Sequence, residues 1–189
     1  NQWVQGTATN NGGTQSVYIS NNGGTTNTYN NNTGSVTHFY KDISFPAGQS
    51  CINLSFDWRA DGEAGVDRLR VFGISPTVTP VAGTQLGTGQ IGGNFNSQTT
   101  YQNTTLTLPS AFAGTTQRIV FTWRNDGSAG NNPPAAVDNI SITTSIPPTP
   151  SCTTYSLPVN GAAVCNAGQT LSWSPLSTPS CGSITYDVY

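Results

Sequence analysis

Apolar and polar residues alternate along several short segments of the chain, which predicts β-strands with one packed face and one wet face. The clearest segment runs from Cys51 to Arg59, where every second residue from Ile52 to Trp58 is apolar. Shorter alternating segments predict strands at 17–20, 37–45, 67–74, 104–108, 118–124 and 137–143. Helical periodicity is absent between them, so we expect an antiparallel β-sandwich. The expected core residues lie on the apolar faces of these strands: Ile52, Leu54, Phe56, Trp58, Leu69, Val71, Ile119, Phe121, Trp123, Ile140 and Ile142.

Two long stretches between the alternating segments predict loops. Residues 6–36 are dominated by Asn, Gly, Thr and Ser, apart from the short strand at 17–20, and residues 75–100 are rich in Gly and Thr. Gly and Asn adopt the positive φ angles that turns require, and Asn and Ser side chains bond to nearby backbone. We therefore expect these stretches to connect strands.

The length and one proline-rich segment divide the chain. With 189 residues, one full domain and part of a second are expected. Residues 146–151, with three prolines, form the predicted linker between a first domain at 1–145 and a second at 152–189. The second has three strand signals, which are too few to close a sandwich of about seven strands. We expect it to be a truncated module.

Charge and hydropathy exclude two kinds of partner. The net charge is −2 and only 7% of residues are charged, so the chain lacks the dense positive field that a nucleic acid requires. It has no run of about 18 apolar residues, so we expect no membrane insertion. Residues 1–3 do not resemble an export signal, and we expect that any such signal preceded them.

Four cysteines indicate a secreted protein. Their spacing matches no zinc pattern, since no Cys-x-x-Cys occurs and the single histidine, His38, is far away in sequence. Disulfides are the preferred interpretation and imply an oxidising compartment. Cys165 with Cys181 is the first candidate pair, because the two flank a strand at 171–173. Cys51 with Cys152 is a weaker candidate, and free buried cysteines remain the alternative.

The residue inventory predicts no catalysis. A hydrolase needs a nucleophile with a base, or two carboxylates facing across a cleft. The available carboxylates gather around a single turn between adjacent strands, at Asp57, Asp61, Glu63 and Asp67. Such a cluster is better suited to binding a cation than to straddling a glycosidic bond.

Two of the carboxylates have an unusual position in the strand pattern. Asp67 is in register with inward Leu69, and Asp138 is in register with inward Ile140, so both are expected to face the core. A buried carboxylate must be paired, hydrogen-bonded or bound to metal. One hypothesis is a Ca²⁺ site formed by Asp67 and Asp138, to which Glu63 or Asp61 contributes. The alternative is that both carboxylates bond backbone amides or an arginine.

Aromatic residues near the Asn-rich loops are candidates for ligand binding, because sugar rings stack on Trp and Tyr. The candidates are Trp3, Tyr18, Tyr29 and Tyr40. The other three tryptophans, Trp58, Trp123 and Trp173, alternate with inner apolar residues and are expected in the core. For Trp3, the alternative is a core residue on an edge strand.

Five motifs together resemble the MAM-like jelly-roll modules of Bacteroidota surface proteins, including cleaved-adhesin domains. The motifs lie at residues 18–21, 56–63, 67–72, 121–126 and 137–142. The last forty residues resemble the start of a fibronectin type III module, with Trp173 as the strand-B tryptophan. These resemblances imply a jelly-roll β-sandwich followed by a partial immunoglobulin-like sandwich.

The resemblance also implies a function. We expect a non-catalytic extracellular adhesion, ligand-binding or spacer module of a large secreted cell-surface protein that is exported by type IX secretion. Its partners would be a protein or glycan bound at the loops and other modules of the same chain. The alternative is an accessory module, binding carbohydrate or substrate, of a secreted peptidase or glycoside hydrolase.

Overall fold

The computed structural model describes residues 1–146, 155–157 and 172–176, and the chain divides into two compact units, Asn1–Ser145 and Ile146–Tyr189. In the second unit, β10 (Tyr155–Leu157) pairs antiparallel with β11 (Ser172–Trp173). The fibronectin-like interpretation of 152–189 and the predicted Cys165–Cys181 disulfide lie outside the described residues. The first unit ends where the sequence predicted the linker to begin.

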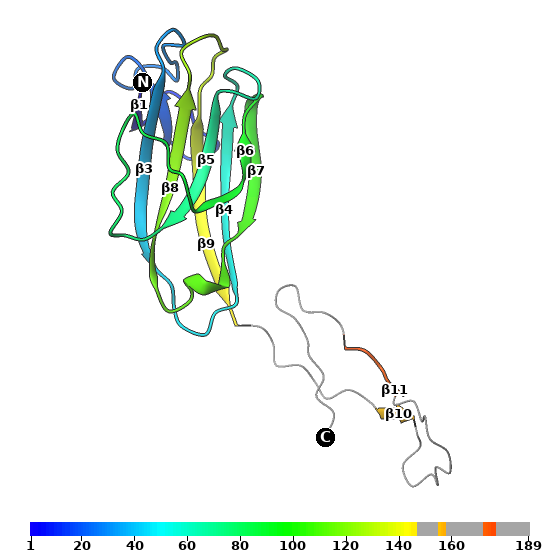
Figure 1. Ribbon diagram of the computed structural model, residues 1–189. Coiled ribbons are helices and arrows are strands. Elements are labelled where there is room, and N and C mark those ends of the chain that lie inside the picture. Colours follow the sequence, from blue (N-terminus) through cyan, green and yellow to red (C-terminus); the bar gives the residue numbers. More distant parts are fainter. Residues whose placement is uncertain (147–154, 158–171, 177–189) are drawn as a thin grey trace. The chain divides into compact units, whose positions relative to one another are not determined.

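The first unit is a sandwich of two antiparallel sheets (Figure 1). The five-stranded sheet contains, in spatial order, β1 (Gln2–Gly6), β2 (Ser16–Ser20), β9 (Ala136–Ser145), β4 (Cys51–Ala60) and β7 (Gln98–Thr107). The four-stranded sheet contains β3 (Ser35–Ser44), β8 (Thr116–Asn125), β5 (Arg68–Ile74) and β6 (Gln90–Phe95). Strands β2 to β9, four in each sheet, have the order of a jelly roll. The expected all-β sandwich is confirmed.

Helical structure is confined, in the described part of the chain, to one short 3₁₀ turn at Ser110–Phe112. No helix there is long and apolar enough to cross a membrane.

The core lies between the two sheets and contains most of the predicted residues. Nine of the eleven are buried, among them Phe56, Phe121 and Trp123. The ring of Phe121 packs edge-on against Phe56 at 5.1 Å and stacks on Phe39 at 4.8 Å. These aromatic contacts join β3 and β8 of one sheet to β4 of the other.

The prediction for β9 was wrong at two positions because the strand contains a β-bulge. Ser55 pairs with Ser141 and Asp57 pairs with Asp138, so β9 has one residue more than β4 between these pairs. Asn139, within the bulge, has φ of 49°. The extra residue reverses the alternation, so Ile140 is 44% exposed and Asp138 lies on the outer face beside Asp57.

The prediction of a loop at 75–100 was wrong for its second part. Residues 90–95 form β6, and β7 begins at Gln98. Strand β6 contains two adjacent glycines, and its pairing with β5 shifts register between Leu69 and Val71. Glycines hide the alternation that reveals a strand, because they have no side chain to place on either face.

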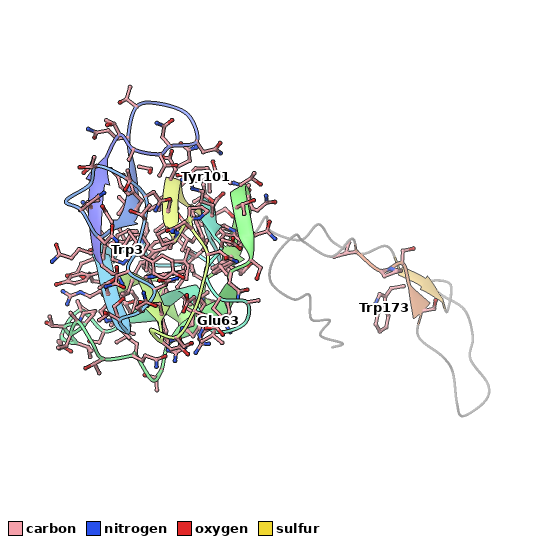
Figure 2. All side chains as sticks on the ribbon, turned by 90° about the horizontal axis from the view of Figure 1, so that it is seen from above. Trp3, Glu63, Tyr101 and Trp173 are labelled. Atoms are coloured by element: carbon pink, nitrogen blue, oxygen red, sulfur yellow. The ribbon has the colours of Figure 1, made fainter. Side chains whose placement is uncertain are left out.

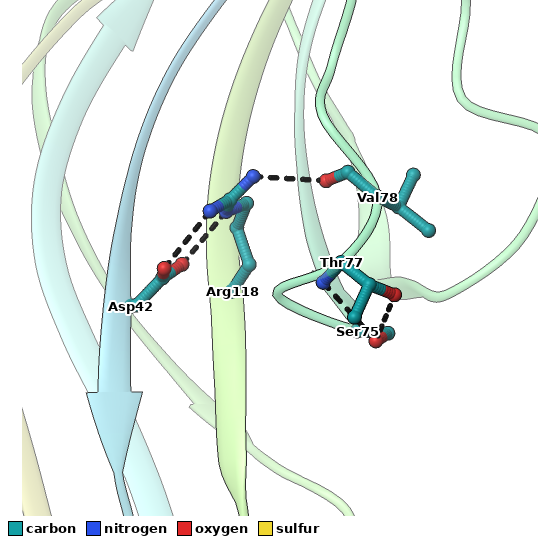
Figure 3. Close-up of polar contacts among 5 residues, drawn as sticks. All are labelled: Asp42, Ser75, Thr77, Val78 and Arg118. Carbon is teal, nitrogen blue, oxygen red and sulfur yellow. Dashed lines mark hydrogen bonds and ion pairs between the residues drawn. The ribbon is translucent and has the colours of Figure 1, made fainter.

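The remaining loop between β5 and β6 is fastened to the four-stranded sheet by Arg118 (Figure 3). Its guanidinium donates two bonds, of 2.7 and 2.9 Å, to the Asp42 carboxylate on β3 and one of 3.0 Å to the Val78 carbonyl. The Asp42 side chain is 41% exposed, so the ion pair contributes modestly to stability. Its main consequence is to hold the loop against β3 and β8.

His38 is held by the same loop. Its Nδ1 lies 2.8 Å from the Thr122 hydroxyl, and its Nε2 lies 3.2 and 3.1 Å from the carbonyls of Val81 and Thr84. Nε2 therefore carries the proton and Nδ1 accepts from Thr122. Burial lowers the pKa of His38. The single histidine of the chain is thus fully hydrogen-bonded by structural partners.

Candidate functional site

Asp67 is a fully buried carboxylate at the end of the sandwich core, just before β5. Its Oδ2 accepts a 2.6 Å bond from the Tyr29 hydroxyl and a 3.1 Å bond from the Glu63 backbone N–H. Its Oδ1 accepts a 3.3 Å bond from the backbone N–H of Asp126. Asp67 lies inward, as predicted, and two of its donors are backbone amides, as in the hydrogen-bonded alternative, but the third donor, Tyr29, was not predicted.

Glycines make room for this buried carboxylate. Gly130 has φ of 128°, and a Cβ built there would lie 2.7 Å from Asp67 Oδ2 and collide with the Tyr29 hydroxyl. Gly62 has φ of 67°, and a Cβ there would come within 2.5 Å of Asp67 Cβ. Both positions therefore need glycine for conformation and for space. The centre is assembled by backbone from two loops as well as by side chains.

Tyr29 is part of this centre and is not a surface aromatic. It is 4% exposed, and its ring packs edge-on against Trp123 at 5.7 Å. Burial raises the pKa of its hydroxyl strongly, and the hydrogen bond to Asp67 and the nearby acidic charges add to the shift. Its hydroxyl therefore remains protonated and donates to Asp67.

The predicted metal ligands are only partly brought together. Glu63 and Asp67 lie with Asp126, each offering a carboxylate oxygen, and the three oxygens are within 4.8 Å of one another. Asp61 is not in this group, although its negative charge acts on Tyr29. Asp138 does not join it either, because the bulge turns Asp138 to the outer face of the other sheet.

The bonds at Asp67 bear on whether this group fits a cation. Two backbone N–H groups and a hydroxyl already donate to its carboxylate, which is what a buried carboxylate requires without a metal. Asp126 accepts bonds of 3.1 and 2.9 Å from the Ser128 N–H and hydroxyl, and these lower its pKa. The same hydroxyl lies 3.0 Å from Glu63 Oε2, so its single proton is shared between the two carboxylates. Calcium stays a prediction, restricted to the less buried oxygens of Glu63 and Asp126.

A second carboxylate centre lies on the outer face of the five-stranded sheet, around Asp57. Asp57 is 8% exposed, and three asparagine side-chain amides donate to it. Asn103 donates to Oδ1 at 2.7 Å, and Asn11 and Asn139 donate to Oδ2 at 2.9 and 2.7 Å. The bonds from Asn139, Asn103 and Asn11 lower the pKa of Asp57, which keeps it ionised. Three exposed residues from separate segments therefore converge on one charge.

Asp138 completes this second centre. Its carboxylate accepts bonds of 2.7 Å from the Asn11 backbone N–H and 2.8 Å from the Asn139 backbone N–H. The Asn139 amide also donates to the Asn11 carbonyl at 2.8 Å. These bonds attach the loop at 6–15 to the bulge of β9. We call the set of Asp57, Asn11, Asn103, Asp138 and Asn139 the outer-face network.

Arg59 and Tyr101 extend the polar surface next to the outer-face network. The Arg59 guanidinium lies 5.4 Å from the centre of the Tyr101 ring and donates to Asn27 Oδ1 at 2.8 Å. Figure 2, which looks down on the sandwich, shows Tyr101 and Glu63 on different sides of the first unit. The two carboxylate centres are therefore separate.

The amide oxygens of the outer-face network point away from its charge. Each of Asn11, Asn103 and Asn139 uses its Nδ2 to bond Asp57. No described residue donates to the Oδ1 of any of them. A carboxamide has two acceptor lone pairs on that oxygen. The network thus presents three acceptors to a ligand that carries hydroxyl or N–H donors.

Three of the four predicted ligand-binding aromatics are buried or packed against the core, and only Tyr40, 44% exposed with the Arg118 guanidinium over its ring, lies on the surface. Tyr18 is fully buried on the outer side of β2, where its hydroxyl donates to the Gly24 carbonyl at 2.5 Å. Trp3 packs edge-on against Phe39 at 4.7 Å, and its indole N–H donates to the Thr37 carbonyl at 3.2 Å. It is therefore the edge-strand core residue of the alternative interpretation. Tyr29 belongs to the Asp67 centre.

Sequence reasoning missed the asparagines of the outer-face network. Asp57 was expected on the wet face of its strand, which is correct, but Asn11, Asn103 and Asn139 are three among many asparagines. They meet only because of the β4–β7 register, the bulge in β9 and the path of the loop at 6–15. The sequence around each of these three asparagines therefore does not indicate that they meet at Asp57.

Cys51 is buried at the start of β4 and is disulfide-bonded. The other three cysteines lie outside the described residues.

Comparisons with known proteins do not name a family. No family model matches the chain, and no curated protein matches it. Among solved structures, the chain is similar to the enzymatically active domain of tailspike protein 4 from bacteriophage CBA120, with 13% identity and a TM-score of 0.45. The similarity covers 76% of this chain and 18% of the tailspike chain.

Proposed function

We propose that the Asn1–Ser145 unit is a non-catalytic ligand-binding module of a secreted cell-surface protein, an adhesin exported by type IX secretion. The ligand binds on the outer face of the five-stranded sheet, and a glycan is the ligand class that fits. The observation that carries the proposal is the outer-face network, in which a charged Asp57 orients three exposed asparagine amides.

The chemistry of the network favours hydroxyl donors. Sugar hydroxyls donate to amide and carboxylate oxygens, and specificity arises when a few polar groups are fixed before binding. Strands β4 and β7 set the positions of Asp57 and Asn103 by their register, the bulge of β9 sets that of Asn139, and hydrogen bonds to Asp138 and Asn139 hold Asn11 in its loop. Tyr101 beside it supplies an aromatic ring of the kind on which sugars stack, held in place by Arg59.

A non-catalytic role is supported by the state of the titratable groups. His38 is occupied by three structural partners, so it does not serve as a general base. Asp57 and Asp138 are neighbours on adjacent strands and both accept hydrogen bonds from the protein, rather than facing each other across a cleft. An oxidising compartment is supported by the disulfide at Cys51.

Titration calorimetry of the full chain with a panel of neutral oligosaccharides tests the proposal. We expect Asn103→Ala to weaken binding about tenfold or more, which corresponds to about 1.4 kcal/mol. The matched control is Thr107→Ala, which removes an exposed side chain from the same face of β7. Among the described residues, the Thr107 hydroxyl bonds Asn53 alone. The control should change the affinity by less than about twofold.

Two outcomes would contradict the proposal. In one, no oligosaccharide in the panel binds. In the other, both variants bind as the parent does, which places the ligand elsewhere. The same glycan binding would serve an accessory module of a secreted hydrolase. The domains encoded on either side of this chain separate that alternative from an adhesin.

A further inference from the structure

The second half of β9 has a free edge. Strand β2 pairs with β9 only at Val17 with Val137 and Tyr18 with Ala136. From Asp138 to Ser145, no described strand pairs with that edge, while β4 pairs with the opposite edge as far as Ser145. Figure 1 shows β1 beside the upper end of the sandwich, with the rest of β9 continuing below it. A row of unpaired backbone N–H and C=O groups is a template for another strand.

An apolar groove lies along this free edge, between β9 and the edge strand β3. Its volume is about 440 Å³, and six apolar residues line it: Phe39, Ile43, Ile119, Phe121, Ile140 and Ile142. At the upper end, Trp3 of β1 closes the sandwich by packing on Phe39. Lower down, no residue that the structure describes corresponds to Trp3, and Ile140 remains 44% exposed. The groove is the continuation of the layer that β1 and β2 occupy above.

Among the described residues, Lys41 is the single charged one that lines the groove. It alternates with Phe39 and Ile43 along β3 and therefore faces the same side of the strand. No described carboxylate forms an ion pair with it, since the one salt bridge in that part of the chain joins Arg118 to Asp42. Its ammonium group is available to an acidic partner.

We propose that this groove binds an extended segment of a partner polypeptide, which adds to the free edge of β9 as a strand in line with β2. The segment places an apolar side chain into the groove at every second position and a carboxylate beside Lys41. This site is distinct from the outer-face network and goes beyond the proposed function.

A peptide strand is the occupant that satisfies both features at once. A small apolar molecule would fill the groove but leave the β9 backbone unpaired, whereas strand addition satisfies backbone and groove together. A second copy pairing through its own β9 fits less well. Residues 139–145 have the sequence Asn-Ile-Ser-Ile-Thr-Thr-Ser, which contains no carboxylate to meet Lys41.

The test uses the full chain and a synthetic nine-residue peptide, blocked at both ends, in which Val alternates with Thr and one inward position is Asp. We expect saturable binding and slower hydrogen exchange at the amides of 139–145. A second peptide has the same side chains but N-methyl groups on every second amide along the pairing edge. This peptide should bind at least about tenfold more weakly, because its methylated amides cannot donate hydrogen bonds to the carbonyls of β9.

A charge exchange tests the contribution of Lys41, which is exposed and therefore replaceable without loss of folding. Lys41→Glu should weaken the binding of the Asp peptide by about tenfold and strengthen the binding of a peptide with Lys at that position. Equal binding of the N-methylated peptide, or no protection at 139–145, would overturn the proposal. So would protection of these amides in the peptide-free protein together with a dimer by light scattering, because a second copy would then occupy the edge.

Discussion

The two carboxylate centres of the first unit differ in the groups that donate hydrogen bonds to them. Asp67 is fully buried and receives its hydrogen bonds from a buried tyrosine and two backbone N–H groups. Asp57 is nearly buried but receives its bonds from side-chain amides of three exposed asparagines. The first centre has no adjustable partner. The partners of the second can exchange a protein bond for one to water or ligand.

This difference separates a structural role from a binding role. Removing a buried acceptor leaves its donors unsatisfied, and the protein bears the full desolvation penalty. Exposed amides that lose their acceptor are rehydrated, so the free energy of unfolding changes little. The Asp67 centre should therefore determine stability, and the outer-face network should determine affinity.

The sharpest test is the same substitution at both centres. Asp67→Asn removes the charge and points an NH₂ group at donors that cannot move, so we expect the free energy of unfolding to fall by about 3 kcal/mol. Asp57→Asn should lower the free energy of unfolding by less than half as much, because the asparagine partners of Asp57 can rotate or bond water. Urea unfolding followed by tryptophan fluorescence measures both. Equal losses would remove the distinction between the centres.

A pair of glycines tests how tightly the Asp67 centre is packed. Gly130→Ala should lower the free energy of unfolding by about 2 kcal/mol, since the new methyl group meets Tyr29 and Asp67 in a left-handed backbone. Gly65 also has positive φ, 76°, but its Cβ would meet nothing within 4 Å. Gly65→Ala should cost about 1 kcal/mol, from conformation alone. If the two losses match, the contact with Asp67 contributes nothing.

The sequence alone was sufficient for much of the fold and for the inward direction of Asp67. Period-two alternation placed Ile52, Leu54, Phe56 and Trp58 in the core, because β4 is a regular strand between two neighbours. Alternation also placed Asp67 inward. In both cases the direction in which the side chain points follows from the alternation of the strand itself.

Prediction failed where one residue changes the alternation or where distant segments converge. The bulge at Asn139 has no signature in the sequence that distinguishes it from a regular strand. It turned Asp138 to the outer face and left Ile140 44% exposed. Tyr29 was placed on the surface because its neighbours are Asn and Thr. It is buried because its loop folds onto Asp67, which lies 38 residues away.

The free energy of unfolding at alkaline pH should depend on the ionisation of Tyr29. Burial and Asp67 raise the pKa of Tyr29 in the folded state above its ordinary value of 10.0. The unfolded chain therefore releases this proton at lower pH, and its contribution to stability is complete below pH 10 and is lost as the pH rises further. The slope is at most about 1.4 kcal/mol per pH unit. Tyr29→Phe should remove this part of the slope in urea unfolding from pH 9 to 11. An unchanged slope would mean that Tyr29 ionises as freely in the folded protein as in the unfolded chain.

Calcium should give the smallest effect, because the most buried oxygens of the acidic group are already occupied. The exposed oxygens of Glu63 and Asp126 remain for a cation, so we expect weak binding at millimolar Ca²⁺, with a rise in Tm of about 2 °C or less. Calorimetric titration should show heat that Asp126→Asn abolishes. Asp138→Asn is the matched control and should leave the heat intact, since Asp138 lies in the outer-face network. Heat that disappears with Asp138→Asn instead would place the cation among the asparagines and would join the binding role to a metal. If the parent protein gives no heat, it binds no Ca²⁺ at this group, and the hydrogen bonds to Asp67 alone compensate for the burial of its charge.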